Sequence, residues 1–178
     1  MCGWFIVNVM YNISLKKVQL VFHMPATVSA VSLLGGIPWV LLLWATGLRK
    51  APKIGAHGWR VLAPIGAAHA VGHAGAVVAI GAGGVSFAQT LKAAEPLFTV
   101  ALSYLVLGTV FRWQVYASLL PVLVGLLLAS LQELAFSARA LCAGLASNAA
   151  FATRAVLGKR TMDTPVGENL DAPNLYAS

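Results

Sequence analysis

The sequence predicts an all-α membrane protein, a polytopic bundle of about six transmembrane helices. The 178 residues are 59% hydrophobic and 10% charged, with a mean hydropathy of +0.81. This composition leaves too few polar side chains to cover a water-soluble protein of this size. Apolar stretches also recur at about the 20 residues that a helix needs to cross a bilayer, with short polar breaks between them. We therefore expect membrane lipid to cover most of the surface, and no stretch fits a soluble domain.

The first two spans are expected at residues 3–22 and 24–46. The first is the least apolar of the six, because Lys16 and Lys17 lie in its last turns, where they would reach the membrane interface. The second opens with Pro25 in its first turn, where the missing N–H breaks no helical hydrogen bond.

The third span, at residues 59–81, is rich in glycine and alanine. Small residues let helix backbones approach closely, so we expect this span inside the bundle. Gly83 and Gly84 predict a tight reversal into a fourth span at residues 85–108. The remaining elements are a fifth span at residues 113–131, a sixth at 136–157, and a polar loop at 158–178 that stops where a seventh helix could begin.

The net charge of +7 does not indicate nucleic-acid binding in this context. Most lysines and arginines stand singly or in pairs at helix ends, without the interleaved aromatic residues of a nucleic-acid interface. Their distribution predicts instead that the N-terminus faces the cytoplasm-like compartment. One side of the membrane would hold Arg49, Lys50, Lys53, Arg60, Arg112, Lys159 and Arg160, and the other Lys16, Lys17 and Arg139.

Two charged residues, Lys92 and Glu95, fall within the fourth span. A charged side chain at membrane depth costs at least about 2.5–3.5 kcal/mol, so each needs a partner or a wet cavity. One interpretation is an ion pair between the two residues at i and i+3. The other is that Lys92 binds a ligand.

Pro96 favours a cavity at this point. It has no N–H to donate to the carbonyl of Lys92, four residues earlier, so the helix should kink or loosen at the lysine. Irregular backbone at membrane depth is tolerated where it lines protein or water. The ammonium of Lys92 would suit a phosphate group, although a purely architectural kink remains an alternative.

His69 and His73 lie one turn apart on the third span, which is half of a possible metal site. No carboxylate or cysteine lies near them in the sequence, so we expect no metal. His73 is instead expected to line a polar path, and His69 to line it or to pack through a hydrogen bond.

Other polar residues within spans have structural interpretations. Asn8 and Asn12 are expected to bond across helices, as are Ser147 and Asn148, and Arg154 is expected to reach for the interface. No nucleophile and base pair, phosphate-binding glycine loop or redox motif is present. We therefore expect neither an enzyme nor a cofactor.

Several motifs extend in order along the whole chain. Together they resemble the plastid phosphate translocator family, of the triose-phosphate/phosphate type, within the drug/metabolite transporter superfamily. The motifs are Trp4-Phe-Ile-Val-Asn-Val-Met-Tyr-Asn12 with Lys16-Lys17, Val85-Ser-Phe87 with Lys92-Ala-Ala-Glu-Pro96, Ser118-Leu-Leu-Pro121, Ser147-Asn148 with Phe151 and Arg154, and Pro173-Asn-Leu-Tyr-Ala177.

The resemblance implies the N-terminal part of a ten-helix inverted-repeat antiporter of the plastid inner envelope, with the N-terminus in the stroma. Such a carrier exchanges inorganic phosphate for a phosphorylated three-, five- or six-carbon metabolite. By the resemblance, Lys92 binds phosphate, His73 lies beside it and Phe151 lines the substrate cavity. Glu95 and Pro96 are expected to shape the cavity because of their place next to Lys92 in the fourth span.

The chain also departs from the family pattern. Ala88-Gln89 replaces a Thr-His pair, and Ala76 replaces a threonine. A second phosphate clamp, a Lys-Arg pair in a late helix, would lie beyond Ser178. We expect triose phosphate as the exchanged metabolite. The alternatives are phosphoenolpyruvate, pentose phosphate or hexose phosphate, a nucleotide-sugar-type carrier, and a truncated fragment that does not transport.

Overall fold

A computed structural model describes residues 2–48, 50–132, 137–163 and 167–168, and nearly all of this part of the chain is helical. In chain order the elements are α1 (Cys2–Val21), α2 (Pro25–Leu34), α3 (Ile37–Ala45), β1 (Lys53–Ile54), α4 (Ala56–Gly83), α5 (Val85–Lys92), α6 (Glu95–Leu107), α7 (Trp113–Gln132), α8 (Ala138–Asp163) and β2 (Gly167–Glu168).

Five segments of the described chain are long and apolar enough to cross a membrane. They are Pro25–Ala45, His57–Gly83, Val85–Leu107, Trp113–Leu131 and Ala138–Met162. The protein is thus an all-α, multi-pass integral membrane protein, as predicted. The sequence predicted about six spans. The predicted first span forms α1, a helix of 20 residues, but it is not among the five apolar segments; it carries Lys16 and Lys17.

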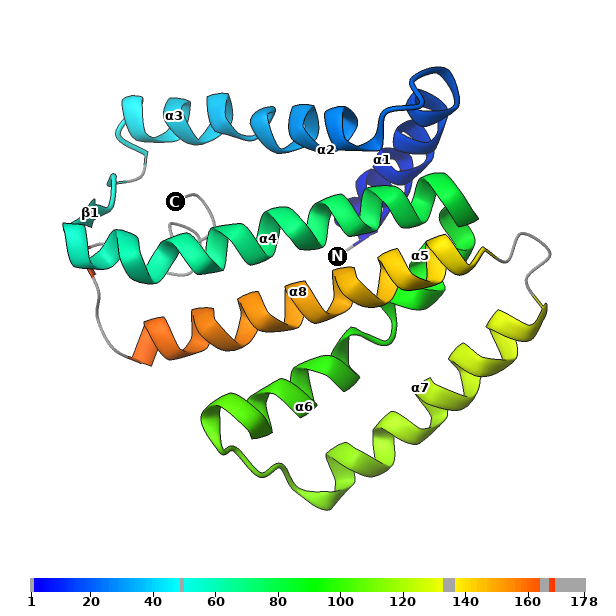
Figure 1. The fold of residues 1–178 in the computed structure, drawn as a ribbon. Coiled ribbons are helices and arrows are strands. Elements are labelled where there is room, and N and C mark those ends of the chain that lie inside the picture. Colours follow the sequence, from blue (N-terminus) through cyan, green and yellow to red (C-terminus); the bar gives the residue numbers. More distant parts are fainter. Residues whose placement is uncertain (1, 49, 133–136, 164–166, 169–178) are drawn as a thin grey trace.

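The helices lie in layers, with α4 and α8 side by side at the centre (Figure 1). On the other side of α4 lies α2, and α3 continues nearly in line with α2. Helix α1 lies across the end of the bundle where α2 begins and α4 ends. On the α8 side, α6 packs next, and α7 lies outermost. Small residues explain the central pair, since α4 is rich in glycine and alanine and lies inside the bundle as expected.

Two spans are interrupted. Gly35 and Gly36 form a turn between α2 and α3, within a stretch predicted as one uninterrupted helix. Ala93 and Ala94 form a turn between α5 and α6. The predicted reversal after α4 is confirmed: Gly84 has φ +94, a conformation that disfavours any residue with a Cβ.

The segment that follows the sixth predicted span differs from its prediction. Residues 158–163 continue α8 to Asp163 instead of belonging to a loop. The predicted start of this span at residue 136 and most of the loop at 158–178 lie outside the described residues. A two-residue antiparallel ladder pairs Lys53 with Glu168 and Ile54 with Gly167, which joins the end of α8 to the start of α4.

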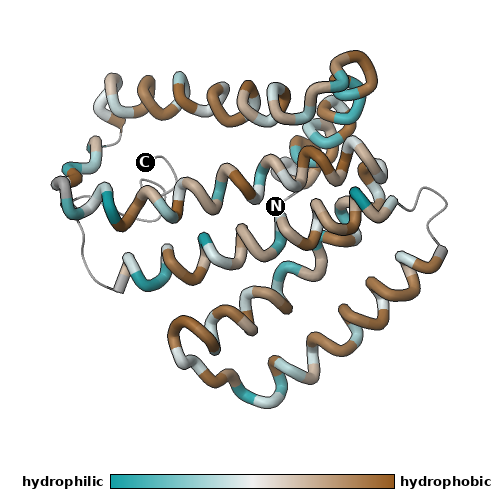
Figure 2. The backbone as a smooth tube through the Cα atoms, in the orientation of Figure 1, coloured by the Kyte–Doolittle hydropathy of each residue, from teal (hydrophilic) through white to brown (hydrophobic). Residues whose placement is uncertain are grey.

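Apolar residues recur along the outer helices (Figure 2), and many large apolar side chains are exposed. Within the described chain, the most apolar stretch of α7 has no buried residue, and Leu131 near the end of this helix is 83% exposed. In water such a surface would aggregate, whereas a bilayer solvates it. The exposed apolar surface is therefore that of a protein embedded in lipid.

Candidate substrate-binding site

The break between α5 and α6 positions Lys92, the last residue of α5. The N–H of Ala93 donates to the carbonyl of Thr90 at 3.1 Å, and that of Ala94 to the carbonyl of Leu91 at 3.0 Å. These are i to i−3 bonds, which tighten the last turn of a helix. Glu95 begins α6 with Pro96 in its first turn. The helix break expected from Pro96 is confirmed.

Asn148 on α8 stabilises this break from the neighbouring helix. Its side chain is 2% exposed, and Nδ2 donates to the carbonyl of Leu91 at 2.7 Å. In an uninterrupted helix that carbonyl would accept from the N–H of Glu95. The amide of Asn148 therefore gives this carbonyl a second hydrogen bond besides the one from Ala94, and ties the end of α5 to α8.

Close contact between α4 and α8 brings the other predicted site residues to the same level. Ser147 Oγ donates to the carbonyl of Gly72 at 2.6 Å. A Cβ placed on Gly75 would lie 2.9 Å from the carbonyl oxygen of Ala143, too close for any real contact. These contacts confirm the expected interhelical bonds of Ser147 and Asn148, and they set Phe151 of α8 beside the histidines of α4.

Phe151 lies at the centre of this group. Lys92 Nζ lies 5.5 Å from the centroid of its ring, a cation–π contact between α5 and α8. The centroids of the His69 and Phe151 rings lie 5.8 Å apart. Gly72 leaves room for the ring, since a Cβ there would lie 2.8 Å from Phe151 Cδ1. Three helices thus meet at one aromatic side chain.

The two histidines differ in their hydrogen bonds. Arg154 Nη1 donates to His69 Nδ1 at 2.9 Å, so that ring nitrogen carries no proton. His73 lies next to His69, with 6.5 Å between ring centroids, and the charge of Lys92 also acts on it. His73 Nε2 is buried and has no hydrogen-bond partner within the described chain. A buried nitrogen of this kind favours a ligand or water that can bond to it.

Lys92 lines an open cavity of ≈ 500 Å³ together with Glu95, Pro96, Thr99 and Phe111. In the described part of the chain its ammonium makes no ion pair with Glu95, which is half-buried in the same cavity wall. The structure therefore does not contain the i, i+3 ion pair that the sequence allowed. The positive charge of Lys92 meets an aromatic face on one side and open space on the other.

The sequence profile of the Triose-phosphate Transporter family matches residues 1–178. The chain belongs to this family. It is also 37% identical over 174 residues to the chloroplastic glucose-6-phosphate/phosphate translocator 2 of Arabidopsis thaliana. The chloroplastic triose phosphate/phosphate translocators of Flaveria trinervia and Pisum sativum are 36% and 35% identical over the same length.

Each of these alignments covers 98% of this chain but only 42–44% of the relative. The chain thus spans less than half the length of these curated members of the Triose-phosphate Transporter family. The family is one of transporters rather than enzymes, in agreement with the lack of a catalytic motif.

Some polar contacts of this family member were not visible in its sequence. Asn12 Nδ2 donates to the backbone oxygen of Asn8 at 2.7 Å and to its Oδ1 at 3.0 Å. Both bonds lie within α1, so the prediction that these residues bond across helices is wrong. Arg154 bonds to His69 instead of only reaching toward the interface. The sequence indicated only that Arg154 and His69 both lie within predicted spans, and this does not specify that they bond to each other.

Proposed function

We propose that the protein to which this chain belongs exchanges an organic phosphate, triose phosphate, for inorganic phosphate across the inner envelope of a plastid. Its family and the names of the relatives support phosphate-linked translocation in plastids. Lys92 binds the phosphate group in this proposal. His73 and Phe151 contribute to the same site, while Glu95 and Pro96 shape the cavity.

The observation that carries the proposal is the environment of the Lys92 ammonium. The group is exposed to an open cavity, next to Phe151, and has no carboxylate partner in the described chain. A compact cation at membrane depth is stabilised most by an anion that approaches from that cavity. A phosphate group provides this charge and up to three acceptor oxygens for the three ammonium donors.

The same geometry accounts for obligatory exchange. When the cavity holds no anion, the positive charge of Lys92 opposes closure of the cavity into an apolar environment, because desolvation of an unpaired ammonium is unfavourable. A bound phosphate neutralises the charge and removes that penalty. The loaded carrier can then change its conformation, whereas the empty one cannot.

The assignment of triose phosphate rests on the sequence motifs. Hexose phosphate is supported by a specific observation, since a glucose-6-phosphate/phosphate translocator is as similar to the chain as the triose phosphate translocators are. Counter-exchange of inorganic phosphate against triose phosphate, phosphoenolpyruvate, pentose phosphate and glucose 6-phosphate would rank them. We expect the highest rate with triose phosphate.

The test of the binding residue is counter-exchange of radiolabelled phosphate in liposomes that contain the complete protein. Lys92→Ala should lower the exchange rate by at least about tenfold, because the phosphate loses its charged hydrogen bonds. Lys159→Ala is the matched control, since Lys159 is an exposed lysine near the end of α8 and should retain the wild-type rate. Unchanged exchange by Lys92→Ala would refute the proposal.

A nucleotide-sugar carrier is distinguished in the same liposomes. Inorganic phosphate should act as a full counter-substrate inside the vesicle, and nucleotide sugars should not compete with its uptake. Strong competition by a nucleotide sugar, without exchange for phosphate, would assign the other transport class.

A further inference from the structure

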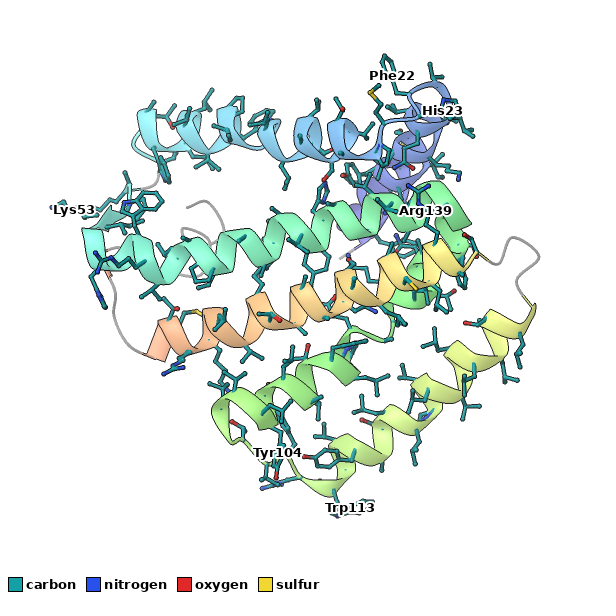
Figure 3. The ribbon with its side chains drawn as sticks, viewed as in Figure 1. Phe22, His23, Lys53, Tyr104, Trp113 and Arg139 are labelled. Atoms are coloured by element: carbon teal, nitrogen blue, oxygen red, sulfur yellow. The ribbon has the colours of Figure 1, made fainter. Side chains whose placement is uncertain are left out.

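A second cavity, of ≈ 190 Å³, lies at the end of the bundle where α1 and α4 end and α2 and α8 begin. Its walls are formed by Gln19, Phe22, His23 and Arg139, together with Pro25 and three residues near the end of α4, Val78, Gly81 and Ala82. Figure 3 shows Phe22, His23 and Arg139 at this end of the bundle and Lys53 at the opposite end of α4. The cavity shares no lining residue with that of Lys92.

Arg139 gives the wall of this end cavity a positive charge. Its described lining residues include Arg139 and His23 but no carboxylate. Arg139 is the second residue of α8, where the positive end of the helix dipole opposes a cation. In the described part of the chain its guanidinium has no hydrogen bond or ion pair. An anion bound here would satisfy both the arginine and the helix dipole.

Gln19 adds a requirement that a simple anion does not meet. The side chain is 8% exposed, and its Nε2 donates to the carbonyl of Val77 at 2.7 Å. This bond fixes the orientation of the amide, so Oε1 is left as a buried acceptor without a partner in the described chain. A hydroxyl group can donate to Oε1, whereas an ionised phosphodiester has no proton to donate. The ligand should therefore carry hydroxyl groups in addition to its negative charge.

An apolar groove adjoins the end cavity. It has a volume of ≈ 380 Å³ and lies between α1 and α2, with Leu15, Val18, Val28 and Val31 among its lining residues. Phe22 lines both the groove and the end cavity. A ligand with one charged, hydroxylated end and one hydrocarbon chain matches the two spaces together. A soluble phosphate ester would leave the groove unused.

We propose that the end cavity and the adjoining groove form a binding site for an anionic phospholipid with a hydroxylated headgroup. Arg139 and His23 face the phosphate, and a headgroup hydroxyl donates to Gln19 Oε1. One acyl chain lies along the groove between α1 and α2. The site is separate from the candidate transport site and does not depend on which solute the carrier exchanges.

The test is native mass spectrometry of the complete, delipidated protein, titrated with phosphatidylglycerol and with phosphatidylcholine. We expect preferential retention of phosphatidylglycerol. Arg139→Gln should weaken its binding roughly tenfold, through loss of a charge-assisted hydrogen bond. Arg112→Gln is the matched control, because Arg112 is also an exposed arginine but lies between α6 and α7 and lines neither the end cavity nor the groove. This variant should retain the lipid. Equal retention of both lipids, or no effect of Arg139→Gln, would overturn the proposal.

A second comparison tests the role of Gln19. Phosphatidylmethanol has the same phosphodiester charge but lacks the headgroup hydroxyls, so the wild type should prefer phosphatidylglycerol over it. Gln19→Leu should abolish that preference and still bind phosphatidylmethanol. Soluble glycerol 3-phosphate should not displace the bound lipid, because it cannot occupy the groove. Displacement by glycerol 3-phosphate would show a site for soluble phosphate esters instead, and an unchanged preference in Gln19→Leu would also overturn the proposal.

Discussion

At the scale of single residues, the surroundings of Lys92 distinguish a binding residue from a structural ion pair. Its ammonium lies 5.5 Å from the centroid of the Phe151 ring and has no carboxylate partner among the described residues. An aromatic face attracts a cation without neutralising it, so the ammonium is oriented and still carries its full charge for an anion. A permanent ion pair with Glu95 would have removed that charge.

Replacement of Phe151 tests this orientation. Phe151→Leu keeps an apolar side chain but removes the aromatic face, which contributes about 0.5–2 kcal/mol to a cation–π contact. We expect the KM for phosphate in liposome exchange to rise by roughly two- to thirtyfold. Phe151→Tyr keeps the face and should stay near the wild-type KM. A Leu variant with the wild-type KM would show that the ring does not position the lysine.

At the scale of elements, the site depends on how closely α4 and α8 approach. Glycines at the contact leave no room for side chains, and Ser147 and Asn148 bond from α8 to backbone carbonyls of α4 and α5. In lipid, close packing and interhelical hydrogen bonds are the main forces between helices. The positions of His73, Phe151 and Lys92 therefore follow from the packing of these three helices.

Gly75→Ala should disturb this packing. The added Cβ would lie 2.9 Å from the carbonyl oxygen of Ala143, a backbone atom that cannot move without shifting α8. Overpacking of this kind costs about 1–3 kcal/mol, so the unfolding temperature in detergent should fall. Gly66→Ala is the matched control on the same helix, because nothing lies within 4 Å of its added Cβ. It should leave the unfolding temperature unchanged or raise it, since alanine favours helix. Equal effects of the two variants would argue against the close contact.

The sequence predicted the elements of this fold better than their contacts. The spans follow from runs of apolar residues, and the break at Lys92 follows from one missing N–H at Pro96, so both are local. The bond from Asn148 to Leu91 joins residues 57 positions apart, and no local pattern specifies it. The turn at Gly35 and Gly36 was missed because glycine is common within transmembrane helices. The bond between Asn12 and Asn8 was misassigned because asparagine can bond within or across helices with equal ease.

At the scale of the whole molecule, the described chain provides one wall of the candidate transport site. Lys92 is exposed, and its cavity is lined on the described side by α5, α6 and the segment that follows α6. A phosphate bound at membrane depth needs positive charge or donors on more than one side, because each uncompensated part of a charge keeps its desolvation penalty. The relatives that match this chain are more than twice as long, and a protein of their length has room for a second wall.

We therefore expect these 178 residues alone, purified and placed in liposomes, not to exchange phosphate. The site would remain open on the side of Lys92, so a bound phosphate could not be enclosed, and alternating access requires two parts that move around an enclosed site. Counter-exchange of radiolabelled phosphate should equal that of protein-free liposomes, whereas the complete protein in parallel vesicles should exchange. Circular dichroism of the same sample should show a helical protein, which separates a missing wall from failure to fold. Phosphate exchange by the 178 residues well above that of empty liposomes would show that one wall is sufficient, and would contradict the two-sided site.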